Sequence, residues 1–456
     1  MLDARLRAVW RRSLSLGWPV AVQQTLNTLM RTVDILVTGF FSPAAVAAIG
    51  LADLYSRVPL RIGMGLGSGA IALSSQDTGR GADVGRDRAI TQALVVGALV
   101  GVPLVLVGLL FSYWLIAVLG AESAVVALGG SYLLLIFAAS PMRIVGMVGA
   151  RSLQGTGDTL TPMLVNAVST TLNIVLTVTL GLGLAGAPRW GIVGVGAATA
   201  ISRTVEATLV VGAIRSPWTA PSLSWSTDPT IARQLFAVAA PDVAGGLSTE
   251  VANFPLNALL LTFGTEATAA FHIASRLYQQ LTAPLFRAFR TVASILVGHA
   301  LGGGRPGDAR YAAGAVSGLS LGTLSVVGAL LFLGAEPLSL LFTRDATTLG
   351  LATDFTRAFA VSMVFIGVYF PLTGALKGAG DTRTPLYAGL LGSYGFLLGA
   401  SYLLAVTLGW GLLGVYVGIV LSWASRAVVV GWVVRRGSWI DLAEGMIAER
   451  AASEEG

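Results

Sequence analysis

The sequence contains no cysteine and two histidines, His272 and His299. The lack of cysteine excludes disulfides, thiolate metal sites and cysteine nucleophiles, and two histidines argue against a histidine-built metal site. Charged residues are also scarce, at 11% of the chain, whereas soluble domains carry about 25%. Because 54% of the residues are hydrophobic, this composition indicates an integral membrane protein.

Long apolar runs separated by short polar segments account for most of the chain. A membrane-spanning helix needs about 20 mainly apolar residues. By that measure we expect an all-α membrane protein with twelve spans, at roughly 14–41, 45–74, 89–111, 123–150, 160–184, 192–214, 232–263, 267–299, 309–333, 348–375, 384–408 and 412–434. The basic start runs into a full-length first span without a small-residue cleavage site, so we expect it to be retained rather than removed as a signal peptide.

Basic residues outside the expected spans fall almost entirely on one side of the membrane. The loops on the other side hold Arg189 and Arg344, whereas the opposite segments hold clusters such as Arg80, Arg86 and Arg88. The positive-inside rule then predicts a multi-pass protein of the cell (plasma) membrane with both termini in the cytoplasm. The basic residues therefore indicate topology, and we expect no nucleic-acid partner.

A short glycine-rich segment occurs twice. QGTGDTLTPM, Gln154 to Met163, returns as KGAGDTRTPL, Lys377 to Leu386, 223 positions later. Its glycines suit a tight turn between two spans, and we expect Thr161 and Thr384 to cap the helix that follows. Since each half holds an even number of spans, the halves are predicted to be parallel repeats, as in several secondary transporters.

The repeat divides the chain into two expected six-helix bundles, residues 1–215 and 232–436. A cytoplasmic linker at 216–231, rich in proline, serine and tryptophan, joins them. A polar cytoplasmic tail at 437–456 contains WIDLAEGMIAER and is predicted to be a surface helix. We expect the protein to be a monomer in the lipid bilayer.

The doubled GxGDTxxP turns, Pro19 in the first span and the VDILVTG segment after it resemble the multidrug and toxic compound extrusion (MATE) family. The resemblance covers about residues 13–435. It implies two six-helix bundles that form a V-shaped cleft. It also implies a secondary antiporter that exports small organic compounds by alternating access, driven by protons or sodium ions, with no enzymatic activity and no bound cofactor.

The resemblance implies that Asp34, the aspartate of VDILVTG, couples transport to ion flow. A buried carboxylate can load and release a proton. The alternative is a structural ion pair with Arg31, which lies three residues earlier on the same helical face. Glu250 resembles the family's carboxylate in the second half, and its alternative is a polar contact between helices.

The fifth expected span departs from the family pattern. Relatives carry NxxxD there, and this chain has Asn173 followed by Thr177 where the aspartate would be. Sodium prefers several hard oxygen ligands, ideally with negative charge. The missing carboxylate therefore favours the proton as coupling ion, with sodium at Asp34 and Asn173 as the alternative.

Central arginines outnumber central acids. The arginines are Arg31, Arg57, Arg61, Arg203, Arg276, Arg357 and Arg426, and the acids are Asp34, Asp53, Glu206 and Glu250. Arginine does not deprotonate in proteins, so the excess predicts an anionic or zwitterionic substrate. The expected substrate-binding residues are Asn27, Arg31, Asp53, Arg57, Arg61 and Arg276.

Two of these groups have structural alternatives. Asp53, Arg57 and Arg61 are spaced i, i+4 and i+8, so they form one stripe that is either a substrate-facing patch or a salt-bridge network that can include Arg276. The pair of Arg203 and Glu206, at i and i+3, is expected to be structural.

Three other functions compete with export. A flippase for lipid-linked precursors would use an arginine-rich cleft for its pyrophosphate head groups, and it stays the alternative function. A membrane-embedded prenyl transferase needs clustered aspartates for magnesium, and the sequence has no DDxxD-like cluster. A channel is disfavoured because nothing resembles a selectivity filter or a ring of identical charges.

Overall fold

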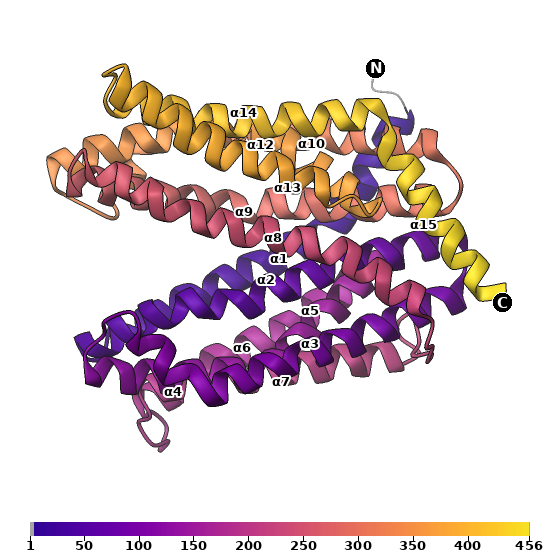
Figure 1. Cartoon of the computed structure of the whole chain (residues 1–456), viewed down its shortest axis with the longest axis horizontal. Coiled ribbons are helices and arrows are strands. Elements are labelled where there is room, and N and C mark those ends of the chain that lie inside the picture. The colour runs from indigo at the N-terminus through magenta and orange to yellow at the C-terminus, as the bar shows by residue number, and fades with distance from the viewer. Residues whose placement is uncertain (1–3, 456) are drawn as a thin grey trace. The chain divides into compact units, whose positions relative to one another are not determined.

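The computed structural model describes residues 4–455, and within that range it contains helices, turns and loops but no strand (Figure 1). The helices are α1 (Ala4–Thr38), α2 (Pro43–Arg80), α3 (Asp83–Ala117), α4 (Ser123–Ala138), α5 (Ser140–Gly155), α6 (Leu160–Leu182), α7 (Ile192–Arg215), α8 (Pro229–Leu261), α9 (Thr265–Gly302), α10 (Pro306–Leu333), α11 (Ala335–Ser339), α12 (Ala346–Gly378), α13 (Arg383–Leu390), α14 (Leu412–Arg436) and α15 (Ser438–Glu455). Two π-helical segments, Leu391–Ala400 and Leu403–Thr407, continue α13.

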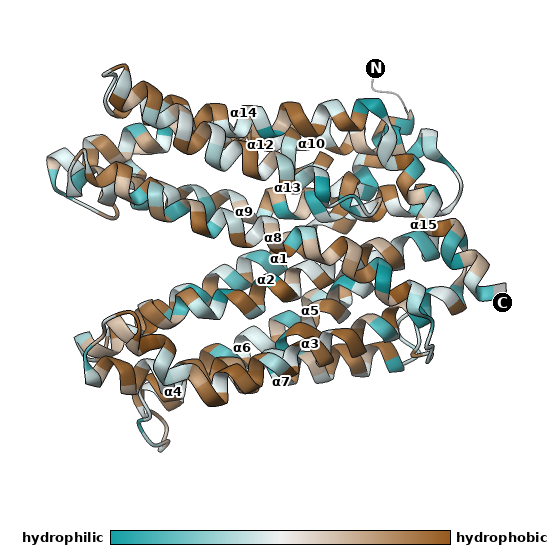
Figure 2. Ribbon diagram, in the orientation of Figure 1, coloured by the Kyte–Doolittle hydropathy of each residue, from teal (hydrophilic) through white to brown (hydrophobic). Residues whose placement is uncertain are grey.

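The helices have the length and composition of membrane spans. Among the described residues, 8 helices are long and apolar enough to cross a membrane, or 9 if α4 and α5 form one span. Figure 2 shows hydrophobic residues along most of α3, α4 and α14, with hydrophilic residues concentrated toward helix ends. The helices α1, α2 and α8 are 35, 38 and 33 residues long but more polar, so the expected number of twelve spans stays a prediction.

The chain folds into two compact units. Among the described residues, the N-terminal unit consists of Val22–Ala240 and 449–455, and the C-terminal unit consists of 4–21 and Pro241–Ala448. In the N-terminal unit α2, α3, α5 and α7 share an aliphatic core, whereas in the C-terminal unit α9 and α12 pack over a core rich in phenylalanine. Gly374 lets these two helices approach, since a Cβ there would lie 2.0 Å from the carbonyl oxygen of Arg290.

The ends of the chain are exchanged between the units, which the expected boundaries at 215 and 232 did not include. The start of α1 lies in the C-terminal unit, where Trp10 Nε1 donates to the Ala315 carbonyl at 2.9 Å. The start of α8 lies in the N-terminal unit, so the first helix of each half changes unit along its length. Pro19 and Pro241 lie close to the positions at which α1 and α8 pass from one unit to the other. Each proline removes an internal hydrogen bond of its helix.

The repeated turns have the expected backbone but a different cap. Gly157 and Gly380 have φ of +94° and +88°, a region that glycine enters without strain. The expected caps, Thr161 and Thr384, were wrong, because the oxygens of the preceding aspartates take that role. Asp158 Oδ1 accepts from the Thr161 amide at 2.9 Å, and Asp381 Oδ1 accepts from the Thr384 amide at 3.0 Å.

The fourth expected span, 123–150, is not one straight helix. It is broken between α4 and α5, which meet at an angle of 46°. Pro141 stands in the first turn of α5, where its missing amide hydrogen costs nothing. Gly101 of α3 packs against it, since a Cβ at Gly101 would lie 2.4 Å from Pro141 Cα.

The segment between α7 and α8 is held along α3 of the N-terminal unit. Arg86 Nη2 donates to the Ala220 carbonyl at 3.1 Å, and Gln92 Nε2 donates to the Ser226 carbonyl at 2.9 Å. Ser222 Oγ donates to Asp87 Oδ2 at 2.6 Å. These bonds fix the expected linker as an ordered part of the N-terminal unit.

Candidate functional site

A stripe of polar residues runs along α6 through the interior of the N-terminal unit. Asn166, Thr170, Asn173 and Thr177 are all buried, although α6 is otherwise largely apolar. Their spacing of four, three and four residues places them on one face of the helix. Buried polar groups in lipid are costly and are commonly functional, so this stripe is the candidate site.

Asp34 of α1 meets the stripe at Thr177. Thr177 Oγ1 donates to Asp34 Oδ1 at 3.2 Å, and Thr38 Oγ1 donates to the Asp34 carbonyl at 2.6 Å. Among the described residues, no basic group lies within 4.0 Å of the Asp34 carboxylate, and the alternative ion pair with Arg31 is not formed. The hydroxyl of Thr177 thus occupies the place beside Asp34 where relatives are expected to have a second carboxylate.

Further contacts join α1 to α5 and α6. Asn166 Nδ2 donates to Asn27 Oδ1 at 3.3 Å, and Gln154 Nε2 donates to Gln23 Oε1 at 3.0 Å. Gln154 Oε1 also accepts from Arg151 Nη1 at 2.9 Å. Asn27, an expected substrate-binding residue, therefore belongs to the same polar interior as Asp34.

Several oxygens of the stripe have no hydrogen-bond partner. They are Asn166 Oδ1, Thr170 Oγ1 and Asn173 Oδ1, all buried. Asn173 uses its amide nitrogen, which donates to Ser202 Oγ at 3.2 Å. Buried acceptors without a partner are rare in folded proteins, and these can receive a water, a protonated group or a cation.

Arg203 and Glu206 of α7 form the expected ion pair. Their side chains are 13% and 8% exposed, and Arg203 Nη1 lies 2.5 Å from Glu206 Oε2. Arg203 Nη2 also contacts Met30 Sδ at 3.6 Å. Because the two charges neutralise each other, Asp34 is the carboxylate of this interior that lacks an ion-pair partner.

The corresponding interior of the C-terminal unit is aromatic. Tyr278 stacks on Phe359 with ring centroids 4.9 Å apart, and Phe370 stacks on Phe286 at 4.1 Å. Arg426 of α14 lies 4.6 Å from the centre of the Trp423 ring. The two units therefore differ in chemistry despite their related sequences.

Arg426 is buried without an acidic partner. Its Nη2 donates to Ser393 Oγ at 2.8 Å, and no carboxylate among the described residues lies within 4.0 Å of its guanidinium. Its Nε has no hydrogen-bond partner. Gly392 makes room for it at the start of the π-helical segment, since a Cβ there would lie 2.2 Å from Nε.

The remaining predicted residues lie on α1, α2, α8 and α9. Asp53 and Arg57 pair at 3.5 Å on the exposed side of α2, with Arg61 one turn further along. Arg31 and Arg276 are exposed, on α1 and α9. Glu250 is half-buried on α8 in the C-terminal unit.

The sequence predicted Asn173 and Thr177 but missed the other half of the stripe. Asn166 and Thr170 were not predicted, and neither were Ser202, the partner of Asn173, and Gln23, the partner of Gln154. These polar residues recur at helical spacing within an apolar span, and that spacing could have identified them. They are uncharged, so the distribution of charged residues does not reveal them.

The sequence matches the model of one known protein family. The MatE family model matches residues 19–179 and 246–403, more than half of the chain. The chain belongs to the MATE family of transporters. It is therefore a membrane-embedded transporter rather than an enzyme, as the sequence predicted.

Relatives of this MATE protein carry multidrug resistance names. The chain is 30% identical over 422 residues to a probable multidrug resistance protein NorM of Bradyrhizobium diazoefficiens, covering 89% of each. It is 26% identical over 405 residues to the multidrug resistance protein MdtK of Pectobacterium atrosepticum, covering 87% of this chain and 88% of that protein.

Solved structures confirm the all-helical MATE fold. A MATE crystal structure in complex with MaD3S has a TM-score of 0.88 at 22% identity, over 97% of this chain and 100% of that one. A transporter from Pyrococcus furiosus, described as having a binding pocket of reversed polarity, has a TM-score of 0.87 at 22% identity, over 97% and 99% of the two chains.

Proposed function

We propose that this MATE protein is a secondary antiporter that exports small organic compounds by alternating access, in exchange for entering protons. The observation that carries the proposal is Asp34, a carboxylate without an ion-pair partner that accepts a hydrogen bond from Thr177 inside the N-terminal unit. Such a group can change its charge without breaking a salt bridge. The multidrug resistance names of the relatives support an organic substrate. The proposed setting is a monomer in the plasma membrane with cytoplasmic termini.

The proton is favoured because one carboxylate suffices to carry it. Thr177 can donate to the charged form of Asp34, and the neighbouring stripe supplies neutral amides and hydroxyls. Among the described residues there is no group of three or more acidic, histidine or cysteine side chains that could hold a metal ion. This limits the negative charge available to offset a bound cation.

Sodium is the second candidate, and one observation favours it. The unpaired oxygens Asn173 Oδ1 and Thr170 Oγ1 lie on the α6 face that also carries Thr177, and oxygen atoms are the ligands that hard cations prefer. Asp34 and Asn173 would then supply the ligands.

Reconstitution into liposomes tests the function and the ion together. With an imposed pH gradient in sodium-free buffer, the protein should move a fluorescent organic dye, and protein-free liposomes should not. Transport that requires a sodium gradient and ignores pH would replace the proton by sodium. Absence of transport under either gradient, with a panel of cationic, zwitterionic and anionic dyes, would contradict the export function.

We further propose that the substrate is anionic or zwitterionic and that Arg57 and Arg61 contact it. The buried guanidinium of Arg426 without a carboxylate partner supports an excess of positive charge in the transporter. Asp53 pairs with Arg57 at 3.5 Å on α2, and Arg61 follows one turn further along the same stripe. A field of this sign concentrates anions.

Changing Arg61 to Gln should weaken binding of an anionic dye by about tenfold, since a hydrogen bond to a charged group contributes about 1.5–3 kcal/mol. Binding of a cationic dye should change little. Arg305→Gln is the matched control, because Arg305 is an exposed loop arginine that pairs with Asp308. Fluorescence anisotropy at equilibrium measures the affinities for the anionic and the cationic dye. Tight, charge-selective binding of cations by the unmodified protein would overturn the assignment.

A further inference from the structure

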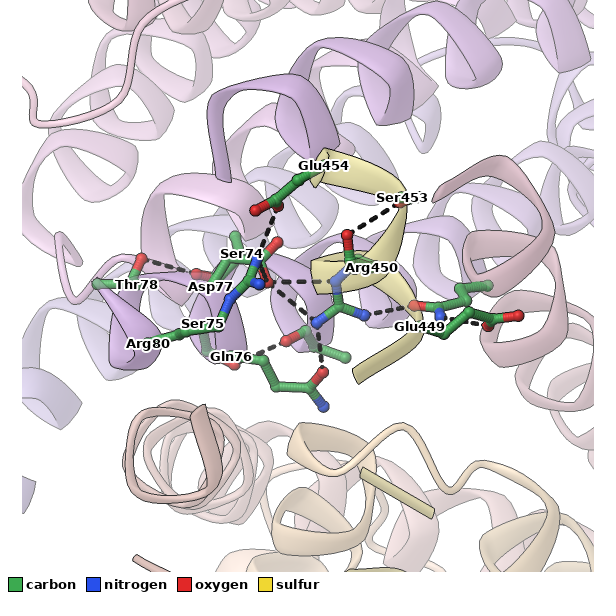
Figure 3. A network of polar contacts seen from close by, with 12 residues as sticks. Ser74, Ser75, Gln76, Asp77, Thr78, Arg80, Glu449, Arg450, Ser453 and Glu454 are labelled. Atoms are coloured by element: carbon green, nitrogen blue, oxygen red, sulfur yellow. Dashed lines mark hydrogen bonds and ion pairs between the residues drawn. The ribbon is translucent and has the colours of Figure 1, made fainter. Parts of the chain in front are cut away.

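The C-terminal end of α15, residues 449–455, is tied into the N-terminal unit by a buried arginine (Figure 3). Arg450 is 2% exposed. Its Nε and Nη2 donate to Asp77 Oδ1 at 3.2 and 3.1 Å, and Nη2 also donates to Gln76 Oε1 at 2.8 Å. Its Nη1 donates to Gln234 Oε1. All three guanidinium nitrogens therefore have partners, drawn from the end of α2 and the start of α8.

Two ion pairs flank this buried contact. Arg80 Nη2 lies 2.6 Å from Glu454 Oε1, and Arg233 pairs with Glu449. Gln234 Nε2 donates to Glu449 Oε2 at 2.8 Å, so Gln234 bridges Arg450 and Glu449. The pair of Arg233 and Glu449 is largely exposed and contributes little, because solvent and salt screen it. The contact of Arg450 with Asp77 is the most deeply buried of the three and is therefore the main anchor.

Asp77 makes the anchor specific for a positive charge. Its side chain is 0% exposed, so its charge must be compensated from within the protein. Arg450 supplies the close contact, and Arg80 reaches the same oxygen only at 3.5 Å. Removing one partner of a buried pair leaves an uncompensated charge. Release of the tail therefore requires that water reach Asp77.

The other end of α15 is anchored by apolar contacts in the C-terminal unit. Trp439, 1% exposed, packs with Ile440 and Ala443 in the core of that unit, and its Nε1 donates to the Val434 carbonyl at 3.1 Å. Exposing this surface would lose the free energy of burial, whereas the polar end can exchange protein hydrogen bonds for bonds to water. Residues 449–455 thus form the end of α15 that can be released.

We propose that residues 449–455 are a releasable latch, which must leave the N-terminal unit before the transporter changes conformation and which therefore slows transport. Contacts made in one conformation and lost in another stabilise the first. The braking role rests on the transport cycle proposed above, whereas the docking of the tail does not. Glu449, Arg450 and Gln234 lie outside the residues matched by the MATE family model.

Two variants release the latch by different routes. Arg450→Ala removes the anchor, and a chain that ends at Ala448 and carries Asp77→Asn removes the tail without leaving a buried unpaired carboxylate. Arg435→Ala, an exposed arginine at the end of α14, is the matched control. Hydrogen–deuterium exchange of residues 449–455 measures docking, and dye efflux from liposomes measures turnover.

In Arg450→Ala, exchange of residues 449–455 should rise by about tenfold or more, while exchange of residues 438–448 stays unchanged. Both release variants should raise turnover by about threefold or more, and Arg435→Ala should change neither quantity. If residues 449–455 of the unmodified protein exchange as fast as a free peptide, the docking is wrong. If release leaves turnover unchanged or lowers it, the brake is wrong. An unmodified protein that moves no dye contradicts the proposed function, and the exchange measurement still decides the docking.

Discussion

Asp34→Asn should reduce gradient-driven efflux to the level of protein-free liposomes, while the protein still inserts and folds. The asparagine keeps the size of the side chain and can accept the hydrogen bond from Thr177, but it cannot take up a proton. A loss of efflux would then result from the inability of residue 34 to change its charge, and not from a packing defect. Dye efflux under an imposed pH gradient measures it.

Two further variants separate coupling from structure. Asp354→Asn changes an exposed carboxylate that pairs with Arg357 at 3.7 Å, and it should leave efflux unchanged. Thr177→Val removes the donor to Asp34 and should lower efflux only in part, since the carboxylate remains. Efflux by Asp34→Asn at the rate of the unmodified protein would refute the role of Asp34.

Arg203→Ala should destabilise the N-terminal unit strongly. It leaves the buried carboxylate of Glu206 without its partner at 2.5 Å. Removing one member of a buried ion pair costs about 3–5 kcal/mol. Thermal unfolding in detergent should show a clearly lower apparent Tm, with a correspondingly smaller yield of folded protein.

The paired change gives the control for this prediction. Arg203→Met together with Glu206→Leu removes both charges and keeps apolar volume, so it should restore most of the lost stability. Arg357→Ala breaks an exposed pair, whose contribution is about 0–1 kcal/mol, and it should hardly change the apparent Tm. A Tm for Arg203→Ala equal to that of Arg357→Ala would show that the pair of Arg203 and Glu206 is not a stabilising contact.

The fold was largely predictable because its signals are local. Apolar length predicted the helices, and the repeated turn predicted the positive φ of Gly157 and Gly380. The break between α4 and α5 was missed although Pro141 marks it, because the apolar run continues through the proline. The π-helical path after α13 depends on packing around Gly392 and has no counterpart in sequence periodicity.

The candidate site was predictable in part. Asp34 and Thr177 came from the family pattern, and the structure brings them within 3.2 Å of each other. The partners of Arg450 were not predictable, because Asp77 lies 373 positions away and no short-range pattern links the two. From the sequence alone, an arginine in a polar tail is expected to be exposed to solvent. Only the folded structure shows that a buried carboxylate lies beside it.

The proposed antiport moves substrate and protons across the membrane in opposite directions, and this exchange can be measured directly. Liposomes that contain the protein, a pH-sensitive dye and trapped substrate are diluted into substrate-free, sodium-free buffer of equal pH. Because coupling is reciprocal, substrate leaving the lumen should drive protons inward, and the lumen should become acidic in the unmodified protein but not in Asp34→Asn. Substrate release with no change in lumenal pH, as expected of an uncoupled flippase, would contradict the claim.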